Sequence, residues 1–270
     1  MSGSRLRGEL SARGHAFAAA NGLAFESTLS RVPSVIFGAD ARRHGNFHPA
    51  SYRNICANPA WARRLTKLHP GHKKAWPRSD WRWRELDSAN SSDALLMNVF
   101  CYRRCVENPS LCAILGIERG VVPEFGFKPR IPLNGGNLDR TEIDMKVGER
   151  LVEAKLTESG FQSVPWRRVE RYRDFEEVFD KEELPTSGET VRSYQLIRGI
   201  LAAHVLGGSF CLLCDARRSD LIEAWYSVVR AVKDCSLRCR LQVLTWQELS
   251  AALPPALRRF LDQKYGVRPA

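Results

Sequence analysis

The sequence has no hydrophobic run long enough to cross a bilayer, since none of its apolar stretches approaches the ~20 residues that a transmembrane helix needs. Residues 1–22 also lack the continuous apolar core of a secretory signal peptide. The same segment has Arg residues and few acids, which leaves a transit peptide open as the less favoured alternative. We therefore expect a cytoplasmic protein with no membrane partner.

A cysteine and histidine pattern typical of a zinc site is missing as well. Cys211 and Cys214 lie in an apolar run that predicts a buried strand, where their thiols would point to opposite faces. The histidines at positions 44, 48, 69 and 72 lie in Pro- and Gly-rich segments, which favours loop histidines over metal ligands. Without a secretion signal, we expect the eight cysteines to be reduced and to serve the structure.

Acidic residues are in short supply relative to basic ones, 30 against 41, and the net charge is +11. Such an excess favours an anionic partner, with nucleic acid as the leading candidate and general basicity as the alternative. A hydrophobic content of 44% and a charged content of 26% are typical of a soluble globular protein. A chain of 270 residues holds one domain with insertions, or two.

Basic and aromatic residues are concentrated in residues 53–84, where Asp80 is the only acid. Four tryptophans alternate there with nine Lys or Arg residues, a pattern that suits phosphate contacts combined with stacking at bases. Tryptophans that anchor an irregular segment while the charges face water are the alternative. The candidate DNA-contacting residues are Arg63, Arg64, Lys67, Lys73, Lys74, Arg78, Arg82 and Arg84.

The segment TEIDMKVGERLVEAKLTE, at 141–158, predicts a β-hairpin because two alternating runs flank a Gly-Glu pair. Gly148 at the first loop position suits a type II′ turn. The resulting register places Asp144 opposite Glu153, and the period of a strand puts Lys155 on the same face as Glu153.

Two carboxylates directly opposite each other on one sheet face repel, unless something positive lies between them. Hard divalent cations take carboxylate oxygens and keep open positions for water and phosphate oxygens. The D-x8-E-x-K spacing therefore indicates a phosphodiester-hydrolysing site on physical grounds. An ordinary solvated hairpin carrying Asp144, Glu153 and Lys155 is the alternative.

The remaining pattern predicts alternating helices and strands around this hairpin. Thr245 and Glu248 form a capping box for a last helix. In chain order, we predict helices over 92–106 and 111–119, a strand over 121–131, helices over 165–181 and 190–206, a strand over 209–215, a helix over 219–232 and a strand over 240–244.

This order of elements, with Asp on the second strand and Glu-x-Lys on the third, resembles the PD-(D/E)xK nuclease superfamily over roughly residues 91–249. The stretches SSDALLMNVF, TEIDMKV, LVEAKLTE and SYQLIRGILAA look like those of a bacterial group of restriction-endonuclease-like proteins. The resemblance implies an α/β (α+β) fold with a mixed central sheet flanked by helices. It assigns residues 89–270 to the nuclease-like domain and leaves residues 1–88 as an irregular, basic, Trp-rich extension that contacts DNA.

The resemblance also implies roles for the residues of the hairpin. Asp144, Glu153 and the backbone carbonyl of Ala154 would hold Mg²⁺ or Mn²⁺. Lys155 would orient or activate the attacking water, or stabilise the developing charge. No other cofactor is expected.

Outside the hairpin, Gln195 matches a glutamine that the superfamily often places on the helix after the lysine. Glu124 is the best candidate for an additional upstream carboxylate, and Glu107 is a poorer one. The sequence departs from the motif at its leading proline, because Glu142-Ile143 precedes Asp144.

The predicted function is metal-dependent endonucleolytic hydrolysis of DNA, which makes the protein a Mg²⁺-dependent deoxyribonuclease. One alternative is an inactive nucleic-acid-binding module that retains the fold, and another is a structural or interaction protein. Cleavage of both strands would suggest a dimer, although the sequence itself predicts no interface.

Overall fold

The computed structural model describes residues 1–28, 33–40, 42–68 and 84–270. It contains two compact units, one formed by residues 1–123 with 246–270 and the other by residues 124–245. The hairpin at 141–158 lies wholly in the second unit. The boundary predicted from the sequence, at residues 88/89, divides the chain into a DNA-contacting extension and a nuclease-like domain. This functional division stays a prediction. No helix in the described ranges is long and apolar enough to span a bilayer.

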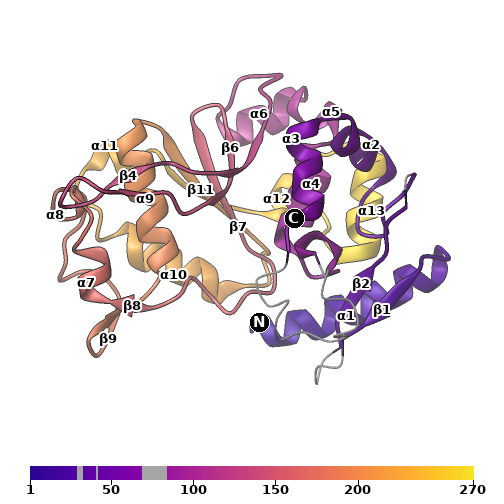
Figure 1. Ribbon diagram of the computed structural model, residues 1–270, viewed down its shortest axis with the longest axis horizontal. Coiled ribbons are helices and arrows are strands. Elements are labelled where there is room, and N and C mark those ends of the chain that lie inside the picture. The colour runs from indigo at the N-terminus through magenta and orange to yellow at the C-terminus, as the bar shows by residue number, and fades with distance from the viewer. Residues whose placement is uncertain (29–32, 41, 69–83) are drawn as a thin grey trace. The chain divides into compact units, whose positions relative to one another are not determined.

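The second unit, every residue of which is described, is built on a mixed five-stranded sheet in the order β12-β11-β7-β6-β3 (Figure 1). Strand β6 is antiparallel to both of its neighbours, β3 and β7, whereas β7, β11 and β12 run parallel. The bounds are Glu124–Phe127 for β3, Ile143–Val147 for β6, Arg150–Ala154 for β7, Ser209–Cys214 for β11 and Leu241–Thr245 for β12. The predicted mixed sheet with flanking helices is confirmed.

The hairpin of β6 and β7 forms as its sequence predicts. Burial alternates strictly along β6, and Val147 pairs with Arg150 while Met145 pairs with Val152. Gly148 has φ 57° and Glu149 does not have a positive φ, which is the combination that a type II′ turn requires. The next strand in the parallel part, β11, is an apolar run in which Cys211 and Cys214 are both buried free thiols, as expected.

Two helices of the second unit cover the sheet. Helix α9 (Tyr194–Leu206) packs on β7 and β11, and helix α10 (Ser219–Val229) packs on β11, β12 and α9. Gly199 is the point of closest approach, because a Cβ added there would lie 2.3 Å from the ring of the fully buried Phe210. The absence of a side chain at Gly199 therefore sets the depth at which α9 lies on the sheet.

We expect Gly199→Ala to lower the free energy of unfolding by about 1–3 kcal/mol, since overpacking a filled core forces a buried ring to move. Phe210 cannot move freely, because it lies 5.8 Å from the ring of Trp225. Chemical denaturation measures the change. Gly38→Ala is the matched control, because a Cβ there meets its nearest atom at 3.8 Å. An unchanged midpoint for Gly199→Ala would contradict the close packing of α9.

One predicted helix is wrong. The segment 165–181 contains two short helices, α7 (Trp166–Val169) and α8 (Phe175–Val178), instead of one long helix. Between the two helices, the backbone N–H of Arg173 donates to the carbonyl of Pro132. The backbone N–H of Asn134 donates to the carbonyl of Arg171. Backbone pairing with a distant segment thus replaces the helical hydrogen bonds that the charged, periodic sequence favours. The other short elements of the second unit are β4 (Ile131–Pro132), β5 (Leu138–Asp139), β8 (Val164–Pro165), β9 (Thr186–Ser187), β10 (Thr190–Val191) and α11 (Cys235–Arg238).

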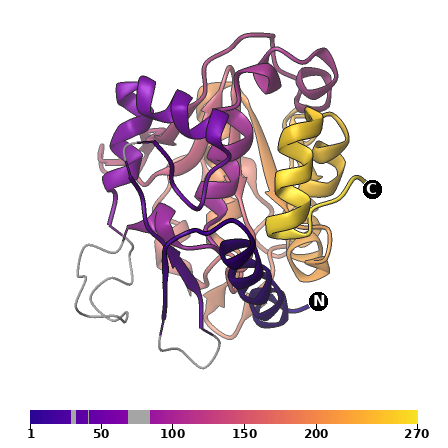
Figure 2. The ribbon, with the colours of Figure 1, turned by 90° about the vertical axis from the view of Figure 1, so that its right-hand side faces the viewer.

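Helix α1 of the first unit (Gly3–Ala20) was not predicted, because its apolar residues follow no clear helical period. It lies beside α13 (Pro255–Tyr265), which brings the two ends of the chain together (Figure 2). The predicted helix 92–106 is divided into α4 (Ser92–Phe100) and α5 (Arg103–Val106), and the predicted strand 121–131 into β3 and β4. The remaining elements are β1 (Phe25–Ser27), β2 (Val35–Phe37), α2 (Pro49–Ala57), α3 (Pro59–Ala62), η1 (Arg63–Thr66), η2 (Glu85–Asp87), α6 (Pro109–Leu115) and α12 (Trp246–Ala251).

Candidate active site

The hairpin brings Asp144, Glu153 and Lys155 together at one end of β6 and β7. The pairing of Met145 with Val152 makes Asp144 and Glu153 the next pair in the same register. Asp144 Oδ2 accepts a hydrogen bond from the backbone N–H of Ala154 at 2.8 Å. The side chain of Asp144, on β6, is therefore held in place by a backbone N–H of the neighbouring strand β7.

Glu153 and Lys155 form a buried ion pair. Their side chains project from the same face of the strand, and Lys155 Nζ lies 2.7 Å from Glu153 Oε1. Glu153 is 2% exposed and Lys155 is 6% exposed. Burial alone would lower the pKa of Lys155, but the carboxylates of Glu153, Asp144 and Glu158 outweigh it and raise that pKa above its usual value. Lys155 is therefore an ammonium ion at neutral pH. This rules out the solvated-hairpin interpretation for Glu153 and Lys155.

The donors at this site suit a hard divalent cation. Asp144 and Glu153 present carboxylate oxygens, which Mg²⁺ and Mn²⁺ prefer, and soft sulfur ligands play no part. In the described part of the chain, no group of three or more His, Cys, Asp or Glu side chains is arranged to hold a metal. A cation here would thus have two side-chain ligands and take its other ligands from backbone, water and substrate. The carbonyl of Ala154 as one of them stays a prediction.

Gln195 lies on the first turn of α9, the helix that packs on β7. Its backbone N–H donates to the carbonyl of Phe161 at 3.0 Å, which ties the start of α9 to the chain leaving β7. The structure therefore places Gln195 on the predicted helix, and its catalytic role stays a prediction.

Arg198 is a residue whose role the sequence pattern did not reveal. It follows Gln195 by one turn, is 5% exposed, and donates from Nη2 to the carbonyl of Glu142 at 2.9 Å. Its guanidinium also lies 5.9 Å from the centre of the Tyr194 ring. Arg198 thus fixes the backbone two residues before Asp144. In the sequence, the signal that could have revealed this role is an Arg among the apolar residues of the predicted helix.

Glu124 is less well placed than the hairpin residues. It is exposed at the start of β3 and pairs with Lys146, not with Asp144. The same register puts Gly126 opposite Asp144, so Glu124 lies two residues away, or about 7 Å along the strand. Its role as a metal ligand remains a prediction. Glu107, the poorer candidate, is in the first unit and pairs with Arg103 at 3.0 Å.

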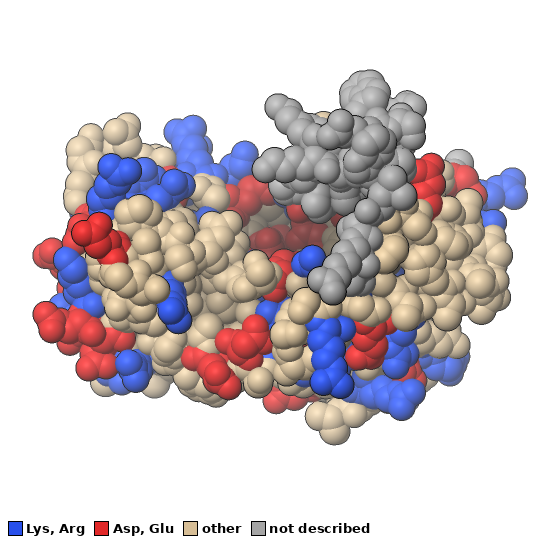
Figure 3. All heavy atoms as spheres, turned by 90° about the horizontal axis from the view of Figure 1, so that it is seen from below, with Lys and Arg blue, Asp and Glu red and all other residues tan. Residues whose placement is uncertain are grey.

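The candidate DNA-contacting residues are only partly described. Arg64 pairs with Asp93 at 2.6 Å and Lys67 pairs with Glu85 at 2.9 Å, while Arg63 is exposed. Trp61 donates from its indole nitrogen to the carbonyl of Pro123, as an anchoring tryptophan does. On the face drawn in Figure 3, the described basic and acidic side chains are interspersed. Arg84 is half-buried, and Lys73, Lys74, Arg78 and Arg82 lie outside the described residues.

A second buried arginine, Arg218, contacts the segment that follows β7. Arg218 is fully buried, donates to the carbonyl of Leu156 at 3.0 Å, and binds both oxygens of Asp220 at 2.8 Å. The Arg218 guanidinium lowers the pKa of Asp220. These contacts join the start of α10 to the segment that follows Lys155.

The mixed sheet, together with an Asp and a Glu-x-Lys on adjacent antiparallel strands, defines a restriction-endonuclease-like protein. The family model described as "Restriction Endonuclease associating with ARP" matches residues 24–266. The chain belongs to this family. No curated protein and no solved structure matches the chain significantly.

Proposed function

We propose that the protein is a metal-dependent endonuclease that hydrolyses phosphodiester bonds of DNA. The observation that carries this proposal is the grouping of Asp144, Glu153 and Lys155 on adjacent strands, with the last two as a buried ion pair. Opposed carboxylates and a buried lysine cost free energy to assemble, which is most readily explained by chemistry. The name of the family, a restriction endonuclease, supports the same conclusion.

Asp144 and Glu153 would hold the divalent cation, with the carbonyl of Ala154 as a further donor. When bound, Mg²⁺ supplies polarisation of the scissile phosphate and a lower pKa for a coordinated water. The N–H of Ala154 keeps the Asp144 carboxylate oriented for this task.

Lys155 holds a positive charge beside Glu153, where it would stabilise negative charge that develops on the phosphate. Gln195, brought to β7 by α9, would orient the attacking water through its side-chain amide. Arg198 acts indirectly, because its hydrogen bond to Glu142 holds the strand that carries Asp144.

Binding of the DNA backbone would rest on the excess of basic residues. A net charge of +11 favours polyanions, and the exposed Arg63 is the described candidate that is best placed to contact phosphates. We therefore expect the affinity for duplex DNA to fall steeply between low and physiological salt.

The proposal is tested by incubating the purified protein with supercoiled and linear DNA in Mg²⁺, in Mn²⁺ and in EDTA. We expect nicked or linear products with either metal and none in EDTA, and calorimetry with Mn²⁺ should detect a bound ion. DNA binding that is accompanied by neither cleavage nor metal binding would identify a binding module that retains only the fold. Absence of DNA binding at low salt would favour a structural role.

A further inference from the structure

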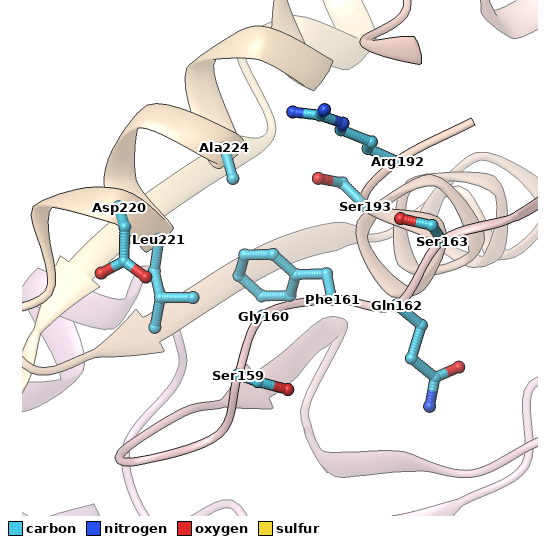
Figure 4. Close-up of a pocket in the computed structure, with 10 residues that line it drawn as sticks. All are labelled: Ser159, Gly160, Phe161, Gln162, Ser163, Arg192, Ser193, Asp220, Leu221 and Ala224. Atoms are coloured by element: carbon cyan, nitrogen blue, oxygen red, sulfur yellow. The ribbon is translucent and has the colours of Figure 1, made fainter. Parts of the chain in front are cut away.

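The second unit contains a pocket of about 380 Å³ that lies next to the candidate active site (Figure 4). Its walls come from the segment after β7, from the residues that precede α9, and from the start of α10. Phe161 forms one wall, and Lys155 Nζ lies 5.8 Å from the centre of the Phe161 ring. Phe161 therefore lines the pocket and also lies close to the lysine of the candidate active site.

Ser193 supplies the pocket with a hydroxyl that lacks a partner. The residue is 7% exposed, its side chain does not cap α9, and it forms no side-chain hydrogen bond with any described residue. In Figure 4 this hydroxyl points into the cavity. A ligand oxygen in the pocket can form a hydrogen bond with this hydroxyl, which is both a donor and an acceptor.

The backbone at the pocket is strained in two places. Ser193 has φ 62° and Gln162 has φ 63°, both in the left-handed region that favours glycine. Non-glycine residues of this kind cluster at ligand sites, where the surrounding structure imposes the conformation. At Ser193, the strained backbone and the hydroxyl that faces the pocket occur in the same residue.

The charge of the pocket is positive. Arg192 is exposed beside Ser193, and its side chain forms no ion pair within the described ranges. The one acidic residue of the lining, Asp220, is neutralised by its two hydrogen bonds with Arg218. The lining near Arg192 and Ser193 therefore suits an anion.

Apolar side chains also line the pocket. Phe161 and Leu221 are buried, and Ala224 adds a methyl group from the next turn of α10. A ligand that fits this lining has an anionic group and a flat or compact apolar part, and the pocket volume lies within the ~300–1,000 Å³ of small-molecule sites.

We propose that this pocket binds one nucleotide unit, with its phosphate on Arg192 and Ser193 and its base or sugar against Phe161, Leu221 and Ala224. The choice of a nucleotide rests on the proposed nuclease function. The unit can come from a DNA strand held at the site or from a free nucleotide, because both present the same chemistry.

Binding is measured on the full chain in EDTA, so that no cleavage intervenes. Calorimetric titrations use thymidine 5′-monophosphate, inorganic phosphate and a single-stranded oligothymidylate of eight nucleotides. We expect the mononucleotide to bind, inorganic phosphate to bind at least about tenfold more weakly, and Arg192→Ala to weaken mononucleotide binding about tenfold through loss of a charge-assisted hydrogen bond. Arg167→Ala removes an equal charge from an exposed position outside the pocket and should change the affinity less than twofold.

Two further variants separate ligand binding from folding. Ser193→Gly removes the hydroxyl and relieves the left-handed strain, so it should weaken mononucleotide binding without lowering the Tm. Ala224→Leu should fill part of the pocket with a larger side chain and weaken mononucleotide binding likewise. No mononucleotide binding by the wild type, equal affinity for inorganic phosphate, or full binding by Arg192→Ala would overturn the proposal.

The two sources of the nucleotide give different patterns. If Arg192→Ala weakens both the oligonucleotide and the mononucleotide, the pocket holds a unit of a strand; if it weakens the mononucleotide alone, the ligand is a free nucleotide. Either pattern supports the proposal that the pocket binds a nucleotide unit. Asp144→Asn should keep wild-type affinity for the mononucleotide, so failure of cleavage and failure of this pocket are distinguishable.

Discussion

Asp144→Asn should reduce metal-dependent DNA cleavage by on the order of a thousandfold or more, because losing one carboxylate ligand removes several kcal/mol of transition-state stabilisation. Asparagine keeps a side-chain oxygen that can accept the hydrogen bond from the N–H of Ala154. The fold should therefore persist, with a Tm close to that of the wild type. Initial rates of plasmid nicking in Mg²⁺ and Mn²⁺ measure the effect.

Glu149→Gln is the matched control for this variant. It makes the same change of carboxylate to amide at the tip of the same hairpin, where the side chain is 77% exposed. The 3.9 Å ion pair of Glu149 with Lys146 is at the surface and contributes little. We expect the control to cleave within about twofold of the wild type. If Asp144→Asn cleaved at that rate too, Asp144 would not be a metal ligand.

The second large effect is expected from Lys155→Met. This change removes the ammonium group that lies 2.7 Å from the buried carboxylate of Glu153 and leaves that carboxylate beside Asp144. Breaking a buried pair in this way costs about 3–5 kcal/mol of stability, since an uncompensated charge remains inside. In EDTA, chemical denaturation should show a loss of this size, and cleavage should be lost as well.

A divalent cation should partly rescue the stability of Lys155→Met. A cation that binds only the folded state stabilises it in proportion to its affinity, and removing the ammonium makes the two carboxylates a more negative site. Mn²⁺ should therefore raise the Tm of the variant by more than it raises that of the wild type. Equal shifts in both proteins would mean that the cation does not bind between Asp144 and Glu153.

The double variant Glu153→Gln/Lys155→Met tests whether the loss of stability in Lys155→Met comes from the uncompensated charge of Glu153. Removing both charges takes away the repulsion that the single variant exposes, so the double variant should be more stable than Lys155→Met alone. It should also lose the Mn²⁺ response, because one carboxylate ligand has become an amide. A double variant that is less stable than the single one would show that Glu153 stabilises the fold independently of Lys155.

The candidate active site was accessible from sequence because its determinants are local. The alternation along β6, the Gly148 turn and the period of two residues in a strand are enough to put Asp144, Glu153 and Lys155 together. The apolar run of β11 likewise predicts a central buried strand without reference to any distant residue. These features survive in the structure because neighbours in sequence create them.

Tertiary structure decided the features that depend on contacts between distant segments. Backbone bonds to residues 132–134 divide the segment 165–181 into two helices, despite a periodicity that favours one. Arg198 acquires its role from a carbonyl 56 residues away. The pocket beside Lys155 exists because three segments meet there and hold Ser193 in a left-handed conformation. The sequence by itself determined which groups come together in the candidate active site, since strand period and turn type are local. Folding determined what surrounds those groups, since packing depends on distant segments.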